Sequence, residues 1–134
     1  MVRSVNCRSV AQHRNPVPNA AIHRGLLITS AILGKEVDVD DYPQDKERQI
    51  ELVFKYLGEI LEEAGATPQD IVKIDLYFAD KTDRALVNPH WLRMYPSQVR
   101  RPARQAHVAA LPQGCCLQLV ATGMVNIQPD DEGE

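Results

Sequence analysis

One long amphipathic segment constrains the fold of this chain more than any other feature. Across residues 43–64, apolar side chains recur at three- and four-residue spacing and form one stripe, which predicts a helix with one buried face. The stripe comprises Ile50, Val53, Phe54, Leu57, Ile60, Leu61 and Ala64. Acidic Asp45 and Glu47 open the segment and Gly65 follows it, as is typical of the two ends of a helix.

Alternating apolar segments on either side of this helix predict the sheet that it packs against. Residues 71–78 alternate with a two-residue period, so that Val72, Ile74, Leu76 and Phe78 are expected on the buried face. Residues 26–33 are almost wholly apolar, which predicts a strand buried on both faces. Further strands are predicted at 2–11, 20–23, 105–110 and 116–125, and a second helix at 82–94 that Pro89 kinks or restarts.

The order β-β-β-α-β-α-β-β predicts an α+β fold with one mixed sheet and two helices packed on a single face. The other face of this sheet stays apolar, because residues 26–33 and 117–120 carry apolar side chains on both sides. Large bare apolar patches are rare on monomers, so we expect the open face to pair with further copies of the chain. Residues 1–127 are predicted to form one domain, and the acidic tail 128–134 is predicted to be disordered.

Composition argues against several classes of protein. The chain has 134 residues and a net charge of −3, with no basic face of the kind that binds nucleic acid. No apolar run approaches the roughly 20 residues that cross a bilayer, and the N-terminus has no apolar signal segment, so we expect a cytoplasmic protein without membrane contact. Three cysteines fit reduced thiols, and the spacing of His13, His23 and His90 does not predict a metal site.

The segment 101–122 carries the strongest indication of a ligand. Pro102 and Ala103 lead Arg104 into a predicted strand, and a turn at Leu111-Pro112-Gln113-Gly114 connects it to a second apolar strand. This places one guanidinium at the mouth of a strand. A guanidinium grips a carboxylate through two parallel hydrogen bonds, so a small carboxylate-bearing metabolite is the first ligand class to consider.

Several short motifs, taken in order, resemble the Rid family (YjgF-like, reactive intermediate deaminases) over roughly residues 15 to 125. The matching segments are Thr29-Ser30-Ala31-Ile32, Gln49 through Ala64-Gly65-Ala66, Ile71-Val72-Lys73-Ile74, Val87-Asn88, Pro102-Ala103-Arg104 and Val108-Ala109-Ala110-Leu111-Pro112. The resemblance implies a chorismate-mutase-like α+β fold assembled as a homotrimer, with each ligand pocket between neighbouring subunits.

The same resemblance implies an activity and a set of site residues. Active members hydrolyse imines and enamines of 2-amino acids to ammonia and a 2-oxo acid, without a metal or organic cofactor. Arg104 would hold the carboxylate as the catalytic residue, and a glutamate on the last strand would orient water. The positions expected to contact the substrate are Ser30, Ala31, Asn88, Trp91, Gln118 and Val120.

The chain departs from the family pattern in ways that bear on catalysis. Counting from Leu111-Pro112, the water-orienting glutamate falls at Val120, and Gln118 on the same strand face could replace it only as a neutral hydrogen-bonding group. The segment 16–19 lacks the family's pocket tyrosine. Arg104 is also one residue closer to Leu111 than in the family, so it reaches the pocket only through a bulge or the preceding loop. Otherwise Ala103 takes that position, since a one-residue slip turns a strand side chain to the other face.

Two functions therefore stay open from the sequence. The first is a hydrolytic deaminase of small 2-imino or enamine acids, with its pocket at the trimer interfaces. The second is a non-catalytic trimer of the same fold that binds a small carboxylate metabolite or a protein partner. An endoribonuclease is disfavoured, because the chain has no basic face.

Overall fold

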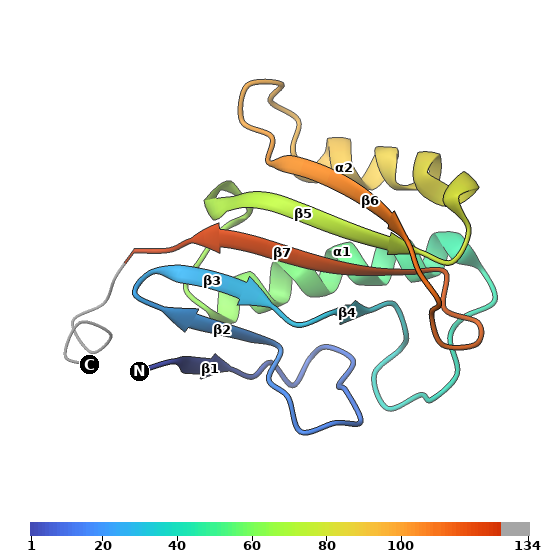
Figure 1. The fold of residues 1–134 in the computed structure, drawn as a ribbon, viewed down its shortest axis with the longest axis horizontal. Helices are drawn as coiled ribbons and strands as arrows, with labels where there is room; N and C mark the ends of the chain where they lie inside the picture. Colours follow the sequence, from blue (N-terminus) through green and yellow to red (C-terminus); the bar gives the residue numbers. More distant parts are fainter. Residues whose placement is uncertain (127–134) are drawn as a thin grey trace.

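A computed structural model describes residues 1–126, which form one seven-stranded mixed sheet with two α-helices (Figure 1). The sheet order is β1-β2-β3-β7-β5-β6, with the short β4 also paired to β7. Only β5 and β6 run parallel, and every other pair is antiparallel. The strands are β1 (Arg3–Val5), β2 (Ala20–His23), β3 (Leu26–Thr29), β4 (Ile32–Leu33), β5 (Ile71–Phe78), β6 (Ala103–Val108) and β7 (Leu117–Met124).

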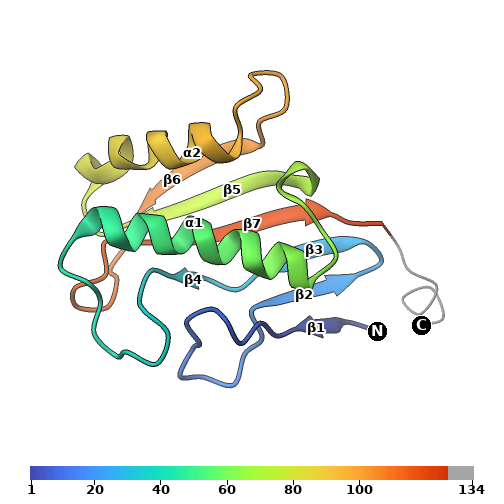
Figure 2. The same ribbon diagram turned by 180° about the vertical axis from the view of Figure 1, so that it is seen from behind.

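Both helices lie on the same face of the sheet, as Figure 2 shows from the side of α1. Helix α1 (Lys46–Glu63) follows the predicted stripe, and the Asp45 carboxylate accepts a hydrogen bond from the backbone N–H of Glu47 at its start. Its apolar face and the inner side chains of β5 and β7, among them Leu76 and Leu119, are fully buried. This arrangement confirms the predicted α+β class with a single mixed sheet and two helices on one face.

The second helical segment is divided where proline restarts it. A 3₁₀ helix, η2 (Lys81–Val87), passes directly into α2 (Asn88–Met94), with Pro89 in the first turn of α2. Proline fits the first turn of a helix, because the backbone N–H groups there have no acceptor within the helix and a residue without an N–H loses no hydrogen bond. The predicted restart is therefore confirmed. A short 3₁₀ helix, η1 (Pro68–Asp70), joins α1 to β5.

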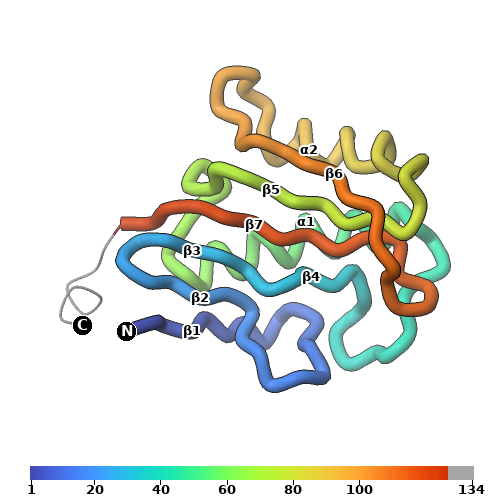
Figure 3. Tube along the Cα trace, viewed as in Figure 1, coloured from blue at the N-terminus to red at the C-terminus, as the bar shows by residue number. Residues whose placement is uncertain are grey.

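The predicted strand 26–33 is broken at Ser30 and Ala31, because both residues bond to loops instead of the sheet. The backbone N–H of Ser30 donates to the carbonyl of Asn19 at 2.9 Å, and its hydroxyl donates to the carbonyl of Pro18 at 2.8 Å. On β7, the Ala121 N–H donates to the Thr29 hydroxyl oxygen at 2.9 Å. The chain thus continues as two strands, β3 and β4, with an irregular step between them (Figure 3).

Two further predictions about strands are wrong in detail. The opening strand covers only Arg3–Val5. The backbone N–H of Cys7 donates a hydrogen bond to Asn19 Oδ1 at 2.7 Å instead of to a neighbouring strand, and the chain continues as a loop. In β5, Val72 is exposed although Ile74, Leu76 and Phe78 are buried as expected. The register against β7 shifts between Ile71 and Lys73, and this bulge turns Val72 to the outside.

The open face of the sheet carries both apolar and charged side chains. Leu26 and Ile28 on β3 are each 43% exposed, so the expected burial of this strand on both faces is wrong for the single chain. On β5 and β6, the Asp75 carboxylate binds His107 Nε2 at 2.9 Å and Lys73 Nζ at 3.3 Å. Within residues 1–126, no helix is long and apolar enough to span a membrane. The predicted tail 128–134 lies outside the described residues.

Candidate functional site

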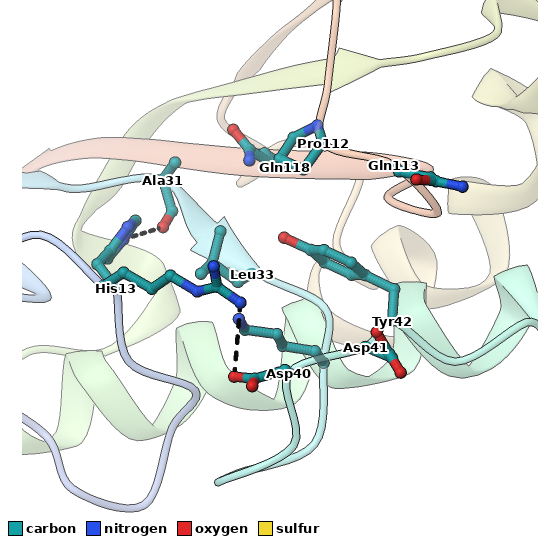
Figure 4. A pocket seen from close by; sticks show the side chains of 11 residues that line it. His13, Ala31, Leu33, Asp40, Asp41, Tyr42, Pro112, Gln113 and Gln118 are labelled. Carbon is teal, nitrogen blue, oxygen red and sulfur yellow. Dashed lines mark hydrogen bonds and ion pairs between the residues drawn. The ribbon is translucent and has the colours of Figure 1, made fainter.

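A cavity of about 650 Å³ opens beside the break between β3 and β4 (Figure 4). Side chains reach it from the loop before β2, from the β4–α1 loop, from the β6–β7 turn and from β7. It is lined by His13, Arg14, Ala31, Leu33, Lys35, Asp40, Asp41, Tyr42, Pro112, Gln113 and Gln118. Two of the residues predicted to contact a substrate, Ala31 and Gln118, are therefore brought together here.

The strand break fixes the floor of this cavity. The carbonyl of Ala31 accepts a hydrogen bond from His13 Nε2 at 2.7 Å, which holds the N-terminal loop against the break. Leu33 pairs with Gln118 in the register between β4 and β7, so the Gln118 side chain is set by the sheet itself. Ser30 lies next to Ala31, but its hydroxyl is already used as a donor to Pro18 and is not prepared to act as a nucleophile.

Tyr42 supplies the polar group opposite Gln118. Its hydroxyl points into the cavity toward Leu33 and Gln118 in Figure 4. Burial raises the pKa of Tyr42, the neighbouring Cys115 thiol raises it further, and the Gln118 amide opposes this shift. The phenol therefore stays protonated near neutral pH. It can donate a hydrogen bond to a ligand, but it does not act as a base.

Charged groups lie at two depths in the cavity. Arg14 and Asp40 form an ion pair at 3.7 Å with both side chains largely exposed, which places them at the rim. Lys35 is buried, and its Nζ lies 5.7 Å from the centre of the Tyr42 ring. The inner part of the cavity is therefore cationic.

Arg104 does not line this cavity. It pairs with Ile74 in the parallel register of β5 and β6, which turns its side chain to the helix-covered face, whereas Ala103 beside Lys73 is on the open face. The guanidinium donates to Asn88 Oδ1 at 2.9 Å and to the carbonyl of Arg84 at 3.3 Å. Within the single chain, Ala103 and Arg104 therefore lie on opposite faces of the edge strand β6, with Ala103 on the open face.

Three predicted site residues thus form a second, separate group. The Arg104 guanidinium lies 5.2 Å from the Trp91 ring centre, and Asn88 at the start of α2 accepts its hydrogen bond. A cavity of about 570 Å³ opens beside them and is lined by Lys81, Thr82, Arg84, Ala85, Asn88, Arg104 and Ala106. Burial lowers the pKa of Arg104.

Val120 belongs to neither cavity. It lies on the open face of β7, opposite Asp75 of β5, and two residues away from Gln118. Of the two positions on this strand, Gln118 is the one that faces the cavity at the strand break. A carboxylate at position 120 would meet Asp75 before it met a ligand in that cavity.

Sequence reasoning missed Lys35 and Tyr42. The segment 34–41 has the composition of an acidic surface loop, and loops of this kind are usually solvated. The available signal was one lysine two residues after an apolar strand and one tyrosine four residues before a helix, which flank the acidic part of this loop. Only the fold brings them to the strand break.

The cysteines add no nucleophile to the site. Cys7, Cys115 and Cys116 are free and buried. Burial, with further contributions from Cys115 and Asp83, raises the pKa of Cys116 to about 12, and burial also raises that of Cys115. Both thiols are therefore protonated and poorly reactive at neutral pH. In the described part of the chain, no group of three His, Cys, Asp or Glu side chains could hold a metal ion.

Comparisons with known proteins identify relatives of the whole domain. Residues 11–124 match the family model described as Endoribonuclease L-PSP. A RutC family protein of Leuconostoc mesenteroides is 33% identical over 113 residues, covering 81% of this chain and 87% of that protein. Reactive Intermediate Deaminase A, a chloroplastic protein of Arabidopsis thaliana, is 31% identical over 106 residues; the match covers 78% of this chain and 56% of the relative.

Solved structures share the fold. A Rid-family protein from Yersinia pestis superposes with a TM-score of 0.84 at 23% identity, covering 93% of this chain and all of that one. RidA from an Antarctic Psychrobacter gives a TM-score of 0.82 at 24% identity, covering 92% and 99%. The family match over most of the chain and the fold agree, and this chain belongs to the Rid family.

Proposed function

We propose that this protein is a hydrolytic deaminase of small 2-imino and enamine acids, with its pockets between the subunits of a homotrimer. The observation that carries the proposal is the cavity at the strand break, where the Tyr42 hydroxyl and the Gln118 amide converge next to the backbone of Ala31. A family relative named as a reactive intermediate deaminase supports the choice of reaction.

The reaction needs little from the protein. Water adds to the electrophilic C2 carbon of the imine, one of its protons moves to nitrogen, and a carbinolamine forms. The carbon–nitrogen bond then breaks, ammonia leaves, and the hydroxyl loses its proton to give a 2-oxo acid. Gln118 would position the water, and the protonated Tyr42 would donate a hydrogen bond to the substrate. Holding an electrophile beside a positioned water supplies much of the acceleration.

A pocket shared between subunits would reunite the two separated groups of predicted residues. Within one chain, Arg104 and Asn88 line one cavity, with Trp91 packed against the Arg104 guanidinium, and Ala31 and Gln118 line another. The first group holds a guanidinium that forms no ion pair among residues 1–126, the second holds the Gln118 amide that would position water, and neither holds both. Arg104 is on the helix-covered face within its own chain, but β6 is the edge strand of the sheet. In the proposed trimer, the Arg104 guanidinium therefore reaches past this edge to the strand break of the next subunit and binds the substrate carboxylate.

Ammonia release from freshly generated 2-iminobutanoate tests this function. Wild type should release ammonia faster than the uncatalysed solution, and Arg104→Ala should lose at least about tenfold in kcat/KM, the loss expected for removing one charge-assisted contact. Arg93→Ala removes an equivalent charge from α2 and is the matched control. If the Arg104→Ala and Arg93→Ala variants both keep wild-type activity, Arg104 has no part in the mechanism.

The alternative function is a non-catalytic trimer that binds a carboxylate metabolite. It is favoured by one observation: the two carboxylates that line the cavity, Asp40 and Asp41, are exposed at its rim, and the inner position holds the neutral Gln118. Binding of 2-oxobutanoate without ammonia release from any 2-imino acid would establish this alternative in place of the enzyme.

A further inference from the structure

We infer that Lys35 binds a second acid group of the ligand, so that the substrate class is the dicarboxylic 2-imino and enamine acids. This inference rests on the proposed function and extends it, since Arg104 is already assigned the carboxylate next to the reacting carbon.

Lys35 is a buried cation without a counter-ion. Its exposed fraction is 9%, yet among residues 1–126 no carboxylate forms an ion pair with it and its Nζ makes no hydrogen bond. The contact that its ammonium does make is with the face of Tyr42. Burying an ammonium without a partner is costly, so such a group is expected where an anion binds.

The backbone around Lys35 is held in place. The Tyr56 hydroxyl, from the buried face of α1, donates to the carbonyl of Lys35 at 2.8 Å. The preceding Gly34 approaches α1 so closely that an added Cβ would lie 2.5 Å from the carbonyl oxygen of Gln49. The ammonium therefore extends from a fixed point, as an anchor for a ligand should.

The acidic residues at the rim do not neutralise this anchor. Asp40 is paired with Arg14, and Asp41 is exposed and forms no ion pair with Lys35. The Tyr42 hydroxyl and Gln118 lie on the side of the cavity assigned to the reaction. A ligand that spans the cavity would thus present one acid group to Lys35 and its imine to Tyr42 and Gln118, and hydrolysis would give ammonia and a 2-oxo dicarboxylic acid.

Calorimetric binding of two product analogues of equal length tests the inference. The ligands are 2-oxoglutarate and 2-oxopentanoate. At the end far from the 2-oxo group, the first carries a carboxylate and the second a methyl group. Wild type should bind 2-oxoglutarate about tenfold more tightly or better, as one charged contact supplies. Lys35→Met should abolish that preference and leave 2-oxopentanoate within about twofold. Lys55→Met, which removes an exposed lysine of α1, should behave as wild type.

The outcomes separate this inference from the proposed function. Equal binding of both ligands by wild type, or an unchanged preference in a folded Lys35→Met variant, would overturn the role of Lys35 while ammonia release could still be observed. If Lys35→Met fails to fold, Lys35→Gln replaces it, since the amide keeps most of the side chain. A preference that depends on Lys35 in a protein that releases no ammonia would support the second anchor in a binding protein and reject the enzyme.

Discussion

In the proposed reaction, Gln118 is the residue on which catalytic strength depends, because it faces the cavity with an amide that can hold water without taking its proton. A Gln118→Glu variant places a carboxylate of nearly the same shape beside Tyr42. General-base assistance contributes ~100-fold or more where it is well placed. We expect Gln118→Glu to raise kcat for ammonia release from a 2-imino acid by about tenfold or more, measured in a coupled ammonia assay.

Val120→Glu is the matched control for that variant. It introduces the same carboxylate two residues along β7, outside the cavity and opposite Asp75. Like charges on directly opposed strand positions repel each other, so this variant should lose stability and gain no activity. A gain with Val120→Glu and none with Gln118→Glu would show that position 120, as the family pattern indicates, is the one that meets the substrate.

Asp75 makes stability depend on pH in a direction that its contacts determine. Burial alone would raise its pKa, but hydrogen bonds from His107 and Lys73 outweigh burial and lower the pKa below 3.8. A carboxyl group whose pKa is lowered in the folded state stabilises the protein at every pH above its ordinary pKa. This stabilisation is lost as the pH falls through the lowered pKa. Asp75→Asn should therefore cost about 1 kcal/mol at pH 7 and much less once the pH falls below the lowered pKa of Asp75, measured by urea unfolding. A pH-independent cost would contradict this account.

At the scale of elements, replacing two glycines on or near α1 by alanine should change the stability of the protein in opposite directions. Gly58 lies inside α1 with nothing within 4 Å of an added Cβ, whereas a Cβ on Gly34 would lie 2.5 Å from the carbonyl oxygen of Gln49 in α1. Gly58→Ala should stabilise the protein by about 0.5–1 kcal/mol, since alanine loses less entropy in a helix. Gly34→Ala should destabilise the protein by about 2 kcal/mol, because the added methyl group would force β4 and α1 apart. Thermal unfolding of both variants checks the pair, and a stabilised Gly34→Ala would refute the close packing.

The elements that the sequence predicts well are those whose pattern is local. The apolar stripe of α1 and the alternation from Ile74 to Phe78 depend only on spacing along the chain, and the structure has both. The break at Ser30 and the bulge at Val72 depend on bonds to Pro18, to Asn19 and to the register of β7, which are far away in the sequence. Spacing along one segment cannot reveal such partners.

The site divides in the same way. Ala31 and Gln118 could be assigned to one pocket from the motifs of the family, and they do line one cavity. Arg104 could not be placed, because one residue fewer before Leu111 leaves two strand registers open and only the pairing with β5 decides between them. Lys35 and Tyr42 carry no motif, and they reach the cavity through the path of a loop.

For the whole molecule, the open sheet face combines two kinds of surface. Its β3 and β7 side carries Leu26, Ile28 and Met124, and its β5 and β6 side carries the Asp75 cluster with the Tyr77 and His107 rings stacked at 4.6 Å. Interfaces between subunits often surround an apolar centre with polar groups that form hydrogen bonds. The two halves of this face suit contact with further copies of the same chain, as the proposed trimer requires.

Assembly therefore predicts how the protein responds to a charge on either face. Wild type should have a mass of about 45 kDa by light scattering, three times the 15.0 kDa chain. Ile28→Lys places a charge on the open face, and Leu92→Lys places one on α2. The native side chains have similar exposed fractions, 43% for Ile28 and 49% for Leu92. The first variant should yield monomers without ammonia release, because burying an unpaired ammonium is costly, and the second variant should leave a trimer with full activity. A trimer with Ile28→Lys, or a monomeric and active wild type, would exclude pockets formed across this face.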